Sequence, residues 1–201
     1  MNTPLLSLDA EQACRLINET LAMHLDAIAA LTTNGVRPRR FPNPDKADRE
    51  QLQRQATLIR FLAITESFST ERLHAEMDQI ITPLGHDGTR KMWMDAHKTA
   101  IMGWDKQKAA YDNWLKVPTR VWTRLLVLTE ARNAAAHGSG QLTWLQQQKH
   151  TPKPASLTSR LNTQKITLDG NRVVLSEESI EQAAETCILF IEELDTSLRT
   201  P

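Results

Sequence analysis

The chain has 201 residues, with 24 lysines and arginines balanced by 24 aspartates and glutamates, so its formal net charge is zero. This length accommodates one domain, residues 1–201, with a hydrophobic core. The charge balance excludes a uniformly basic nucleic-acid-binding protein and restricts any RNA contact to a local basic groove. The sequence contains no signal peptide and no apolar run long enough to cross a membrane, so we expect a cytoplasmic protein without membrane contact.

The first predicted helix begins at a capping box formed by Asp9 and Gln12, and it ends at Asn34-Gly35. The proline-rich and arginine-rich segment 34–46 then predicts an exposed loop. We interpret the arginines of this loop as solvated, with contact to an RNA backbone as the alternative. These arginines are Arg37, Arg39 and Arg40.

A second helix is predicted from about Ala47 to Ile81, because apolar residues recur there at helical spacing. Glu66 falls on the apolar stripe of this helix, and a carboxylate in such a position requires a partner. One interpretation is a local ion pair or a place at the water-facing rim. The other is that Glu66 pairs with Arg132 and holds its guanidinium in place.

A third helix is predicted from about Thr89 to Leu115, after the break at Pro83-Leu84-Gly85. Its aromatic residues recur at helical spacing, which favours a place in the core or at a subunit interface over stacking with unpaired bases. The two cysteines, Cys14 and Cys187, lie at apolar positions of helices and are interpreted as unreactive core thiols.

The fourth predicted helix runs from Val117 to Ala136 and opens with Pro118, at a position where proline is tolerated. After it, the polar segment 146–164 predicts an exposed, mobile loop. Residues 166–175 predict a short hairpin around an Asp-Gly turn. Ser176 is the predicted cap of a last amphipathic helix. Together these elements indicate an all-α fold, an up-and-down helical bundle with a small β-hairpin before the last helix.

The fourth helix ends in the sequence Arg132-Asn133-Ala-Ala-Ala-His137-Gly138. A guanidinium holds a phosphate through two parallel hydrogen bonds, and an imidazole transfers protons near neutral pH. Gly138 is expected to end the helix in the left-handed conformation that glycine adopts without strain. The combination predicts a phosphate-directed acid–base site at the C-terminus of a helix.

Spacing alone does not single out this motif, because Arg90 and His97 are separated by a similar interval. A histidine at the end of a helix can also serve only to complement the negative end of the helix dipole. The second motif is favoured because Arg132 is followed directly by an asparagine. In addition, His137 meets a glycine at a helix end, whereas His97 lies inside a helical pattern.

Arg132-Asn133-x3-His137-Gly138 resembles the Arg-x4–6-His signature of the HEPN superfamily, α-helical domains of prokaryotic toxins and defence ribonucleases. The order of elements over residues 50–200 also resembles that family. The resemblance implies a metal-independent endoribonuclease, a toxin or phage-defence effector, in which the ribose 2′-hydroxyl attacks the adjacent 3′-phosphate. It implies that His137 is the general base or acid, that Arg132 stabilises charge on the phosphate, and that Asn133 orients one of these groups.

One histidine supplies one proton-transfer group, whereas this reaction needs a base and an acid, so the resemblance implies a homodimer with two facing motifs. The expected partners are RNA and a second copy, with an antitoxin or a defence-system protein as a further candidate. No cofactor is expected, because the sequence has no glycine-rich phosphate loop and no zinc-ligand motif. Two alternatives remain: a non-catalytic RNA-binding or adaptor module of HEPN type, and a helical interaction protein whose motif is only a helix cap.

Overall fold

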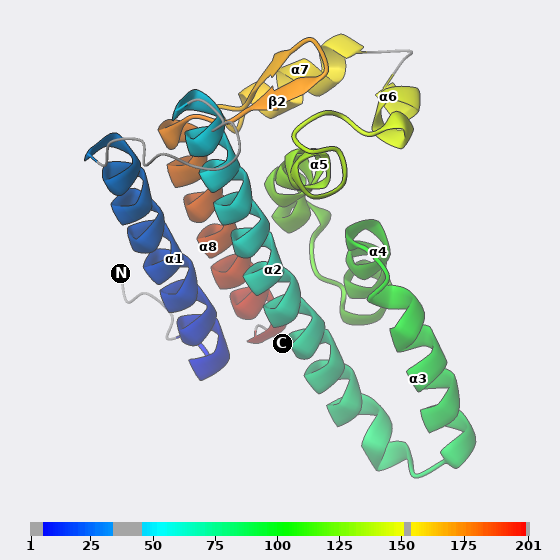
Figure 1. Ribbon diagram of the computed structural model, residues 1–201. Coiled ribbons are helices and arrows are strands. Elements are labelled where there is room, and N and C mark those ends of the chain that lie inside the picture. The colour runs from blue at the N-terminus through cyan, green and yellow to red at the C-terminus, as the bar shows by residue number, and fades with distance from the viewer. Residues whose placement is uncertain (1–5, 34–45, 151–153, 200–201) are drawn as a thin grey trace, which may run out of the picture.

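A computed structural model describes residues 6–33, 46–150 and 154–199 of this chain. The predicted all-α class is confirmed, since helices dominate and the described strands form one small hairpin (Figure 1). The long helices are α1 (Leu8–Thr33), α2 (Lys46–Ile81), α5 (Thr123–His137) and α8 (Glu177–Arg199). Shorter elements are η1 (Thr82–Leu84), α3 (Asp87–Ala100), α4 (Trp104–Leu115), η2 (Thr119–Trp122), α6 (Trp144–His150), α7 (Pro154–Asn162), β1 (Thr167–Asp169) and β2 (Arg172–Val174).

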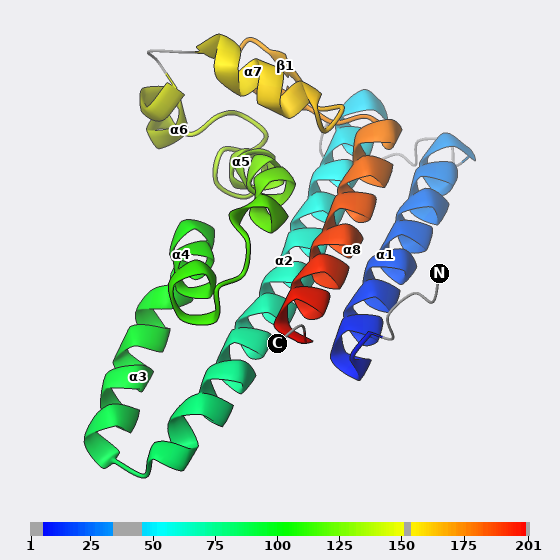
Figure 2. The same ribbon diagram turned by 180° about the vertical axis from the view of Figure 1, so that it is seen from behind.

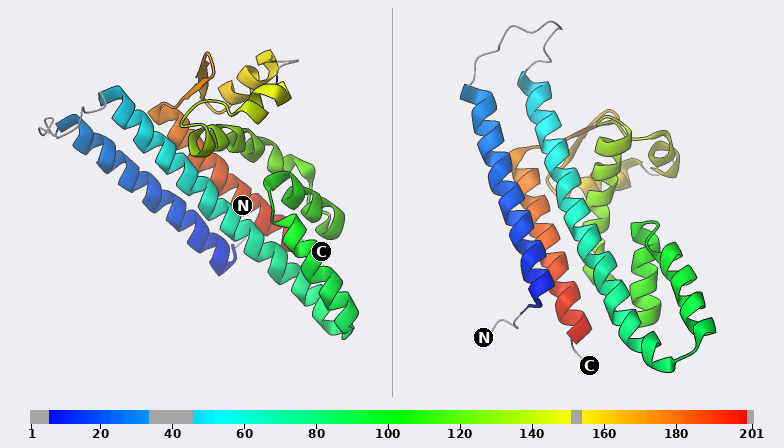
Figure 3. Two further views of the ribbon diagram at one scale, coloured as in Figure 1. Left: turned by 45° about the vertical axis from the view of Figure 1, so that its right-hand side comes forward. Right: turned by 60° about the horizontal axis from the view of Figure 1, so that its bottom comes forward.

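The four long helices form an up-and-down bundle in which successive members run in opposite directions (Figures 1, 2 and 3). Helices α1, α2 and α8 lie side by side, and α5 packs against α2 and α8. The C-terminal half of α2 extends past the bundle and carries α3 and α4 as an arm (Figure 3). Helices α6 and α7 and the hairpin cover the opposite end of α5.

A cluster of aromatic side chains packs α4 and the start of α5 against α8. Trp122 is fully buried and packs at 4.9 Å from Phe190 of α8 and at 5.4 Å from Tyr111 of α4, between ring centroids. The Tyr111 hydroxyl donates a 2.6 Å hydrogen bond to the carbonyl of Ser69 in α2. The predicted core role of these aromatic residues is therefore confirmed for Tyr111 and for Trp93, which is also buried.

Four predicted elements differ from the structure, and one of them is the helix expected from Val117 to Ala136, since residues 119–122 form η2 and α5 begins only at Thr123. The first helix begins at Leu8, and Ser7 caps it in place of the expected Asp9 box, because the Ser7 hydroxyl accepts the Ala10 amide hydrogen at 3.2 Å. The single helix expected over residues 89–115 is two helices, α3 and α4, separated by an extended Gly103. The prediction of a loop over residues 146–164 is wrong, since this segment contains most of α6 and all of α7.

Helix α6 forms because Thr143 and Gln146 make a capping box. The polar composition of the segment favours the prediction of a loop. The Thr143 amide donates to the Gln146 side-chain oxygen at 3.0 Å, and the Gln146 amide donates to the Thr143 hydroxyl at 3.3 Å. These two bonds satisfy donors that the first turn of a helix otherwise leaves unpaired. The loop expected over residues 34–46 lies outside the described residues, except for Lys46, which begins α2.

Other predictions are confirmed. The second helix spans nearly the expected residues, and the hairpin pairs Asp169 with Arg172 across Gly170 and Asn171. Ser176 caps α8, since its hydroxyl accepts the Ser179 amide hydrogen at 3.1 Å. Burial raises the pKa of the Cys187 thiol to about 12 and that of Cys14 to about 11. Both thiols are therefore protonated at neutral pH, as expected of unreactive residues.

None of the helices in the described ranges combines the length and apolar character that crossing a bilayer requires. The N-terminus of α1 is held to α8 by polar contacts. The fully buried carboxylate of Asp195 accepts hydrogen bonds from the Ser7 amide at 2.9 Å and the Ser7 hydroxyl at 2.6 Å. Arg199 forms an ion pair with the same carboxylate at 3.1 Å.

Asp195→Ala should lower the free energy of unfolding by about 3–5 kcal/mol, because it leaves buried donors without an acceptor. Urea denaturation followed by circular dichroism measures this loss. Glu193→Ala, on the exposed side of the same helix, is the matched control and should change stability by less than about 0.5 kcal/mol. Equal effects of the two substitutions would contradict a structural role for the Asp195 contacts.

Candidate functional site

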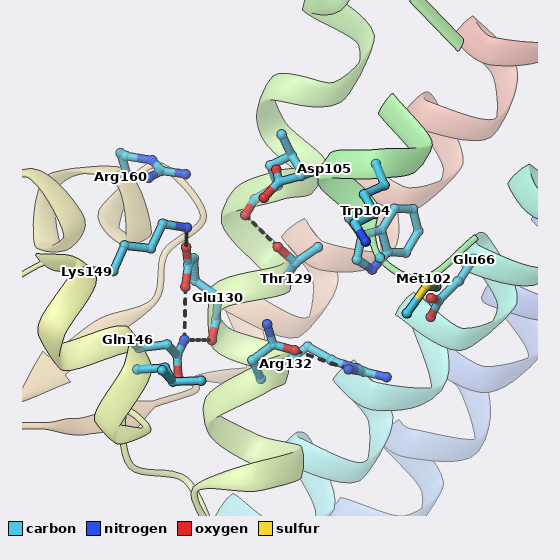
Figure 4. Close-up of a pocket in the computed structure, with 15 residues that line it drawn as sticks. Glu66, Met102, Trp104, Asp105, Thr129, Glu130, Arg132, Gln146, Lys149 and Arg160 are labelled. Atoms are coloured by element: carbon cyan, nitrogen blue, oxygen red, sulfur yellow. Dashed lines mark hydrogen bonds and ion pairs between the residues drawn. The ribbon is translucent and has the colours of Figure 1, made fainter. Parts of the chain in front are cut away.

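A cleft of ≈ 810 Å³ lies where α2, α4, α5, α6 and α7 meet (Figure 4). Arg132 and Asn133 of the predicted motif line it from α5, and Glu66 lines it from α2. The structure thus brings together three of the four predicted site residues. The remaining lining residues are Met102, Gly103, Trp104, Asp105, Lys106, Leu126, Thr129, Glu130, Leu145, Gln146, Lys149 and Arg160.

Arg132 is half-buried in the wall of this cleft, and its Nη1 donates a 3.1 Å hydrogen bond to the side-chain oxygen of the adjacent Asn133. Its buried Nε atom has no hydrogen-bond partner. Asn133 therefore holds one edge of the guanidinium. The side chain retains donors that an anionic ligand would satisfy.

Glu66 shares the cleft with Arg132, but no ion pair or hydrogen bond joins the two side chains in the part of the chain that the structure describes. Its carboxylate is half-exposed and has no ion-pair partner among these residues. Glu66 thus reaches the predicted site, with both of its oxygens free to accept hydrogen bonds from a ligand.

His137 is the last residue of α5, and its side chain is exposed. It does not line the cleft that contains Arg132 and Asn133. The five positions from Arg132 to His137 rotate these two side chains well apart around the helix axis, and His137 lies one turn beyond Asn133. Within one chain, Glu66, Arg132 and Asn133 therefore line the cleft, and His137 lies outside it at the C-terminal end of α5.

Gly138 does not adopt the expected left-handed conformation, since its φ is −113°. The left-handed residues are Ser139, with φ of 51°, and Gly140, with φ of 88°. Gly138 is needed instead for close approach, because a Cβ atom there would lie 1.8 Å from the carbonyl oxygen of Gln141. The turn that follows His137 is also held by β2, where the Val173 amide donates to the Gly140 carbonyl at 2.8 Å.

A buried carboxylate on α5, Glu130, belongs to the site although the sequence did not single it out. The Gln146 side-chain amide donates to the Glu130 carboxylate at 3.0 Å and to its backbone carbonyl at 2.8 Å. Lys149 pairs with the same carboxylate at 2.9 Å, and His150 lies 3.5 Å away. These contacts attach α6 to α5 and place Leu145 and Lys149 at the cleft.

Burial by itself raises the pKa of Glu130. The hydrogen bonds from Gln146 and Lys149 and the positive charges of Lys149 and His150 outweigh it, so the pKa lies below its usual 4.5. Glu130 is therefore a charged structural anchor at neutral pH, and proton transfer by this carboxyl group is not expected.

The competing motif, Arg90 and His97, lies on the outer arm in α3. His97 packs against Trp93 and His74, with ring centroids 5.0 Å apart in each case. Burial, followed by the nearby His74, lowers the pKa of His97. The structure thus places this pair outside the cleft and gives its histidine a packing role.

Comparison of the chain with protein-family models, with curated proteins and with solved structures finds no match. Among the residues that the structure describes, no three His, Cys, Asp or Glu side chains are grouped so that they could hold a metal ion.

Glu130→Gln should destabilise the protein by about 1–3 kcal/mol at pH 7, because it weakens the charge-assisted bonds from Lys149 and Gln146. The folded-state pKa of Glu130 is depressed, so its contribution is present above the ordinary value of 4.5 and is lost as the pH falls through the folded-state pKa. Urea denaturation of wild type and variant from pH 7 to pH 3 should show the difference shrinking below about pH 4.5. A pH-independent difference would contradict this assignment.

Proposed function

We propose that this chain is a metal-independent endoribonuclease of HEPN type, a toxin or phage-defence effector that cleaves RNA by attack of a 2′-hydroxyl on the adjacent phosphate. The observation that carries the proposal is the Arg132–Asn133 pair, bonded at 3.1 Å in the wall of a cleft, on the same helix that ends at His137. A guanidinium held in this way is oriented before a phosphate binds, which favours stabilisation of the transition state.

Each residue of the motif has one role in the proposed reaction. Arg132 binds the scissile phosphate and stabilises the charge that develops on its oxygens. His137 takes the proton from the 2′-hydroxyl or gives one to the departing 5′-oxygen. Asn133 holds the guanidinium through its side-chain oxygen. Gly138 and the turn after it fix the backbone beside His137.

A homodimer is part of the proposal, because each motif offers one imidazole to a reaction that needs both a base and an acid. The side chain of His137, at the C-terminal end of α5, is exposed, so a second copy can approach it. Trp144 and Leu145 lie close by along the chain, and both side chains are about two-thirds exposed (67% and 69%). Large exposed apolar groups of this kind favour contact with another protein surface.

A local excess of basic residues on the two sides of α5 supports RNA as the substrate. A second groove, of ≈ 830 Å³, adjoins the cleft and is lined by Lys108, Arg124 and Arg160. Arg160 and Leu126 belong to both hollows, so the two are continuous across α5. Lys106, Lys108, Arg124 and Arg160 form no ion pair within the described residues, so their charges are available to a phosphate backbone.

The second candidate is a non-catalytic RNA-binding or adaptor module of HEPN type. One observation favours it: His137 does not line the cleft in which Arg132 and Asn133 lie. In that case Arg132 would bind RNA without cleavage. Retention of intact RNA by the purified protein, with no product after long incubation, would distinguish this candidate from the ribonuclease.

Cleavage should persist in excess EDTA, because the motif residues alone transfer the protons and stabilise the phosphate. It should leave a 2′,3′-cyclic phosphate and a 5′-hydroxyl, because the 2′-oxygen is the nucleophile. Mass spectrometry of the products of a single-stranded RNA tests this directly. A substrate with a 2′-deoxyribose at the scissile position should remain intact. A strict requirement for Mg²⁺ would refute the mechanism.

His137→Ala should lower the rate of cleavage by about 10²–10⁴-fold, the usual contribution of a positioned acid or base, and should leave RNA affinity nearly unchanged. Arg132→Ala should reduce both rate and affinity, since the guanidinium contacts phosphate before and during the reaction. Asn133→Ala should have an intermediate effect. Rates and affinities are measured on one fluorescent RNA, with circular dichroism to confirm folding.

Arg90→Ala and His97→Ala are the matched controls, because they change the same residue types at similar spacing on the outer arm. Both variants should retain wild-type turnover. Loss of cleavage in these controls, with cleavage preserved in the Arg132 and His137 variants, would show that the other motif carries the activity.

A further inference from the structure

The end of the cleft beside Arg132 carries an apolar wall and a free carboxylate that the proposed reaction does not use. Figure 4 shows Glu66, Met102 and Trp104 together at one end of the cleft, and Lys149 and Arg160 at the other. The first end combines apolar surface with an acceptor, and the second is basic. A molecule with a flat polar ring at one end and a phosphate at the other matches this arrangement.

Trp104 is a rigid part of this wall. Its indole packs edge-to-face against Trp122 and Phe190, with ring centroids 6.4 and 6.3 Å apart, and both of those side chains are buried. Met102 is 74% exposed and provides a polarisable, adaptable surface beside it. Aromatic and apolar surfaces of this kind stack unpaired bases in complexes with single-stranded RNA.

Glu66 supplies the free acceptor at this end of the cleft. Its carboxylate offers two acceptor oxygens and no donor, and it is not bound to Arg132 or to any other cation among the described residues. Guanine presents two neighbouring donors, N1–H and the N2 amino group, on its Watson–Crick edge. In adenine, cytosine and uracil each donor on that edge is flanked by an acceptor, which a carboxylate repels.

We propose that this end of the cleft is a guanine-binding subsite, in which Glu66 accepts hydrogen bonds from N1 and N2 of a guanine that lies against Trp104 and Met102. The proposal rests on RNA as the substrate and specifies the nucleotide bound next to the scissile phosphate. The unpaired Arg160 and Lys106 lie along the same cleft and are available to the phosphate of that nucleotide. Such a subsite makes cleavage selective for positions beside a guanine.

The subsite is tested without cleavage by titrating the intact protein with GMP, IMP, AMP, CMP and UMP. The chain has five tryptophans, so a ¹H–¹⁵N spectrum resolves their indole N–H signals, and Trp104→Phe assigns the signal of Trp104 by its loss. GMP should shift this signal. IMP, which lacks the N2 amino group, should bind about tenfold to a hundredfold more weakly, as expected for one hydrogen bond to a charged group.

Glu66→Gln should weaken GMP binding by about tenfold or more and bring it close to that of IMP, because it removes the charge and one acceptor. Glu71→Gln is the matched control, since Glu71 lies on the same helix but lines a separate groove against α1. This control should bind GMP as the wild type does. Equal affinity for all five nucleotides, an unshifted Trp104 signal, or an unchanged GMP preference in Glu66→Gln would each overturn the subsite.

The outcome is separable from that of the proposed ribonuclease activity. RNA cleavage without any guanine preference would refute the subsite and leave the reaction intact. Selective GMP binding that depends on Glu66, without RNA cleavage under any condition, would support the subsite and point to the non-catalytic RNA-binding module.

Discussion

A buried carboxylate must be paired, and the way Glu130 meets this requirement shapes the whole region around the motif. The side chain leaves α5 at a position that is only 6% exposed, where an unpaired charge would be strongly destabilising. Gln146 and Lys149 supply the partners at 3.0 and 2.9 Å, and both belong to α6. Helix α6 therefore docks on α5, and the cleft exists because this docking leaves a space between α6 and the first turn of α4.

The position of α5 explains why the residues of one short motif lie on two surfaces, the cleft and the exposed end of the helix. Seven of its residues are buried against neighbouring elements, so few positions remain for polar chemistry. Arg132 and Asn133 line the cleft, and the exposed side chain of His137 lies at the C-terminal end of the helix. The close approach of Gly138 to the Gln141 carbonyl then turns the chain sharply toward β2. A ligand that contacts both surfaces must lie across the last turns of α5, as an extended strand does more readily than a compact molecule.

The net charge is zero, but acidic and basic groups are distributed differently over the molecule. The paired acidic groups, among them Asp195, Glu177 and Glu130, join neighbouring helices. Several basic groups along α5 and its flanks form no such pairs in the described ranges, and they line two adjoining hollows. The local potential therefore favours an anion although the whole chain is neutral. A carboxylate kept free at one end of such a cleft carries selectivity more readily than affinity, because it disfavours acceptors and phosphate.

Sequence alone determined the helical class, the long second helix, the hairpin and the cap of α8, because local periodicity, turn chemistry and capping residues act over a few positions. It also identified Arg132, Asn133 and His137 as neighbours on one helix. It did not reveal α6 and α7, since polar composition outweighed the Thr143–Gln146 capping box, and it joined α3 to α4 across Gly103. Only the tertiary structure decided which of these side chains share a cleft. That Glu66 and Trp104 share a cleft with Arg132, while His137 lies outside it, depends on how helices distant in sequence pack against one another.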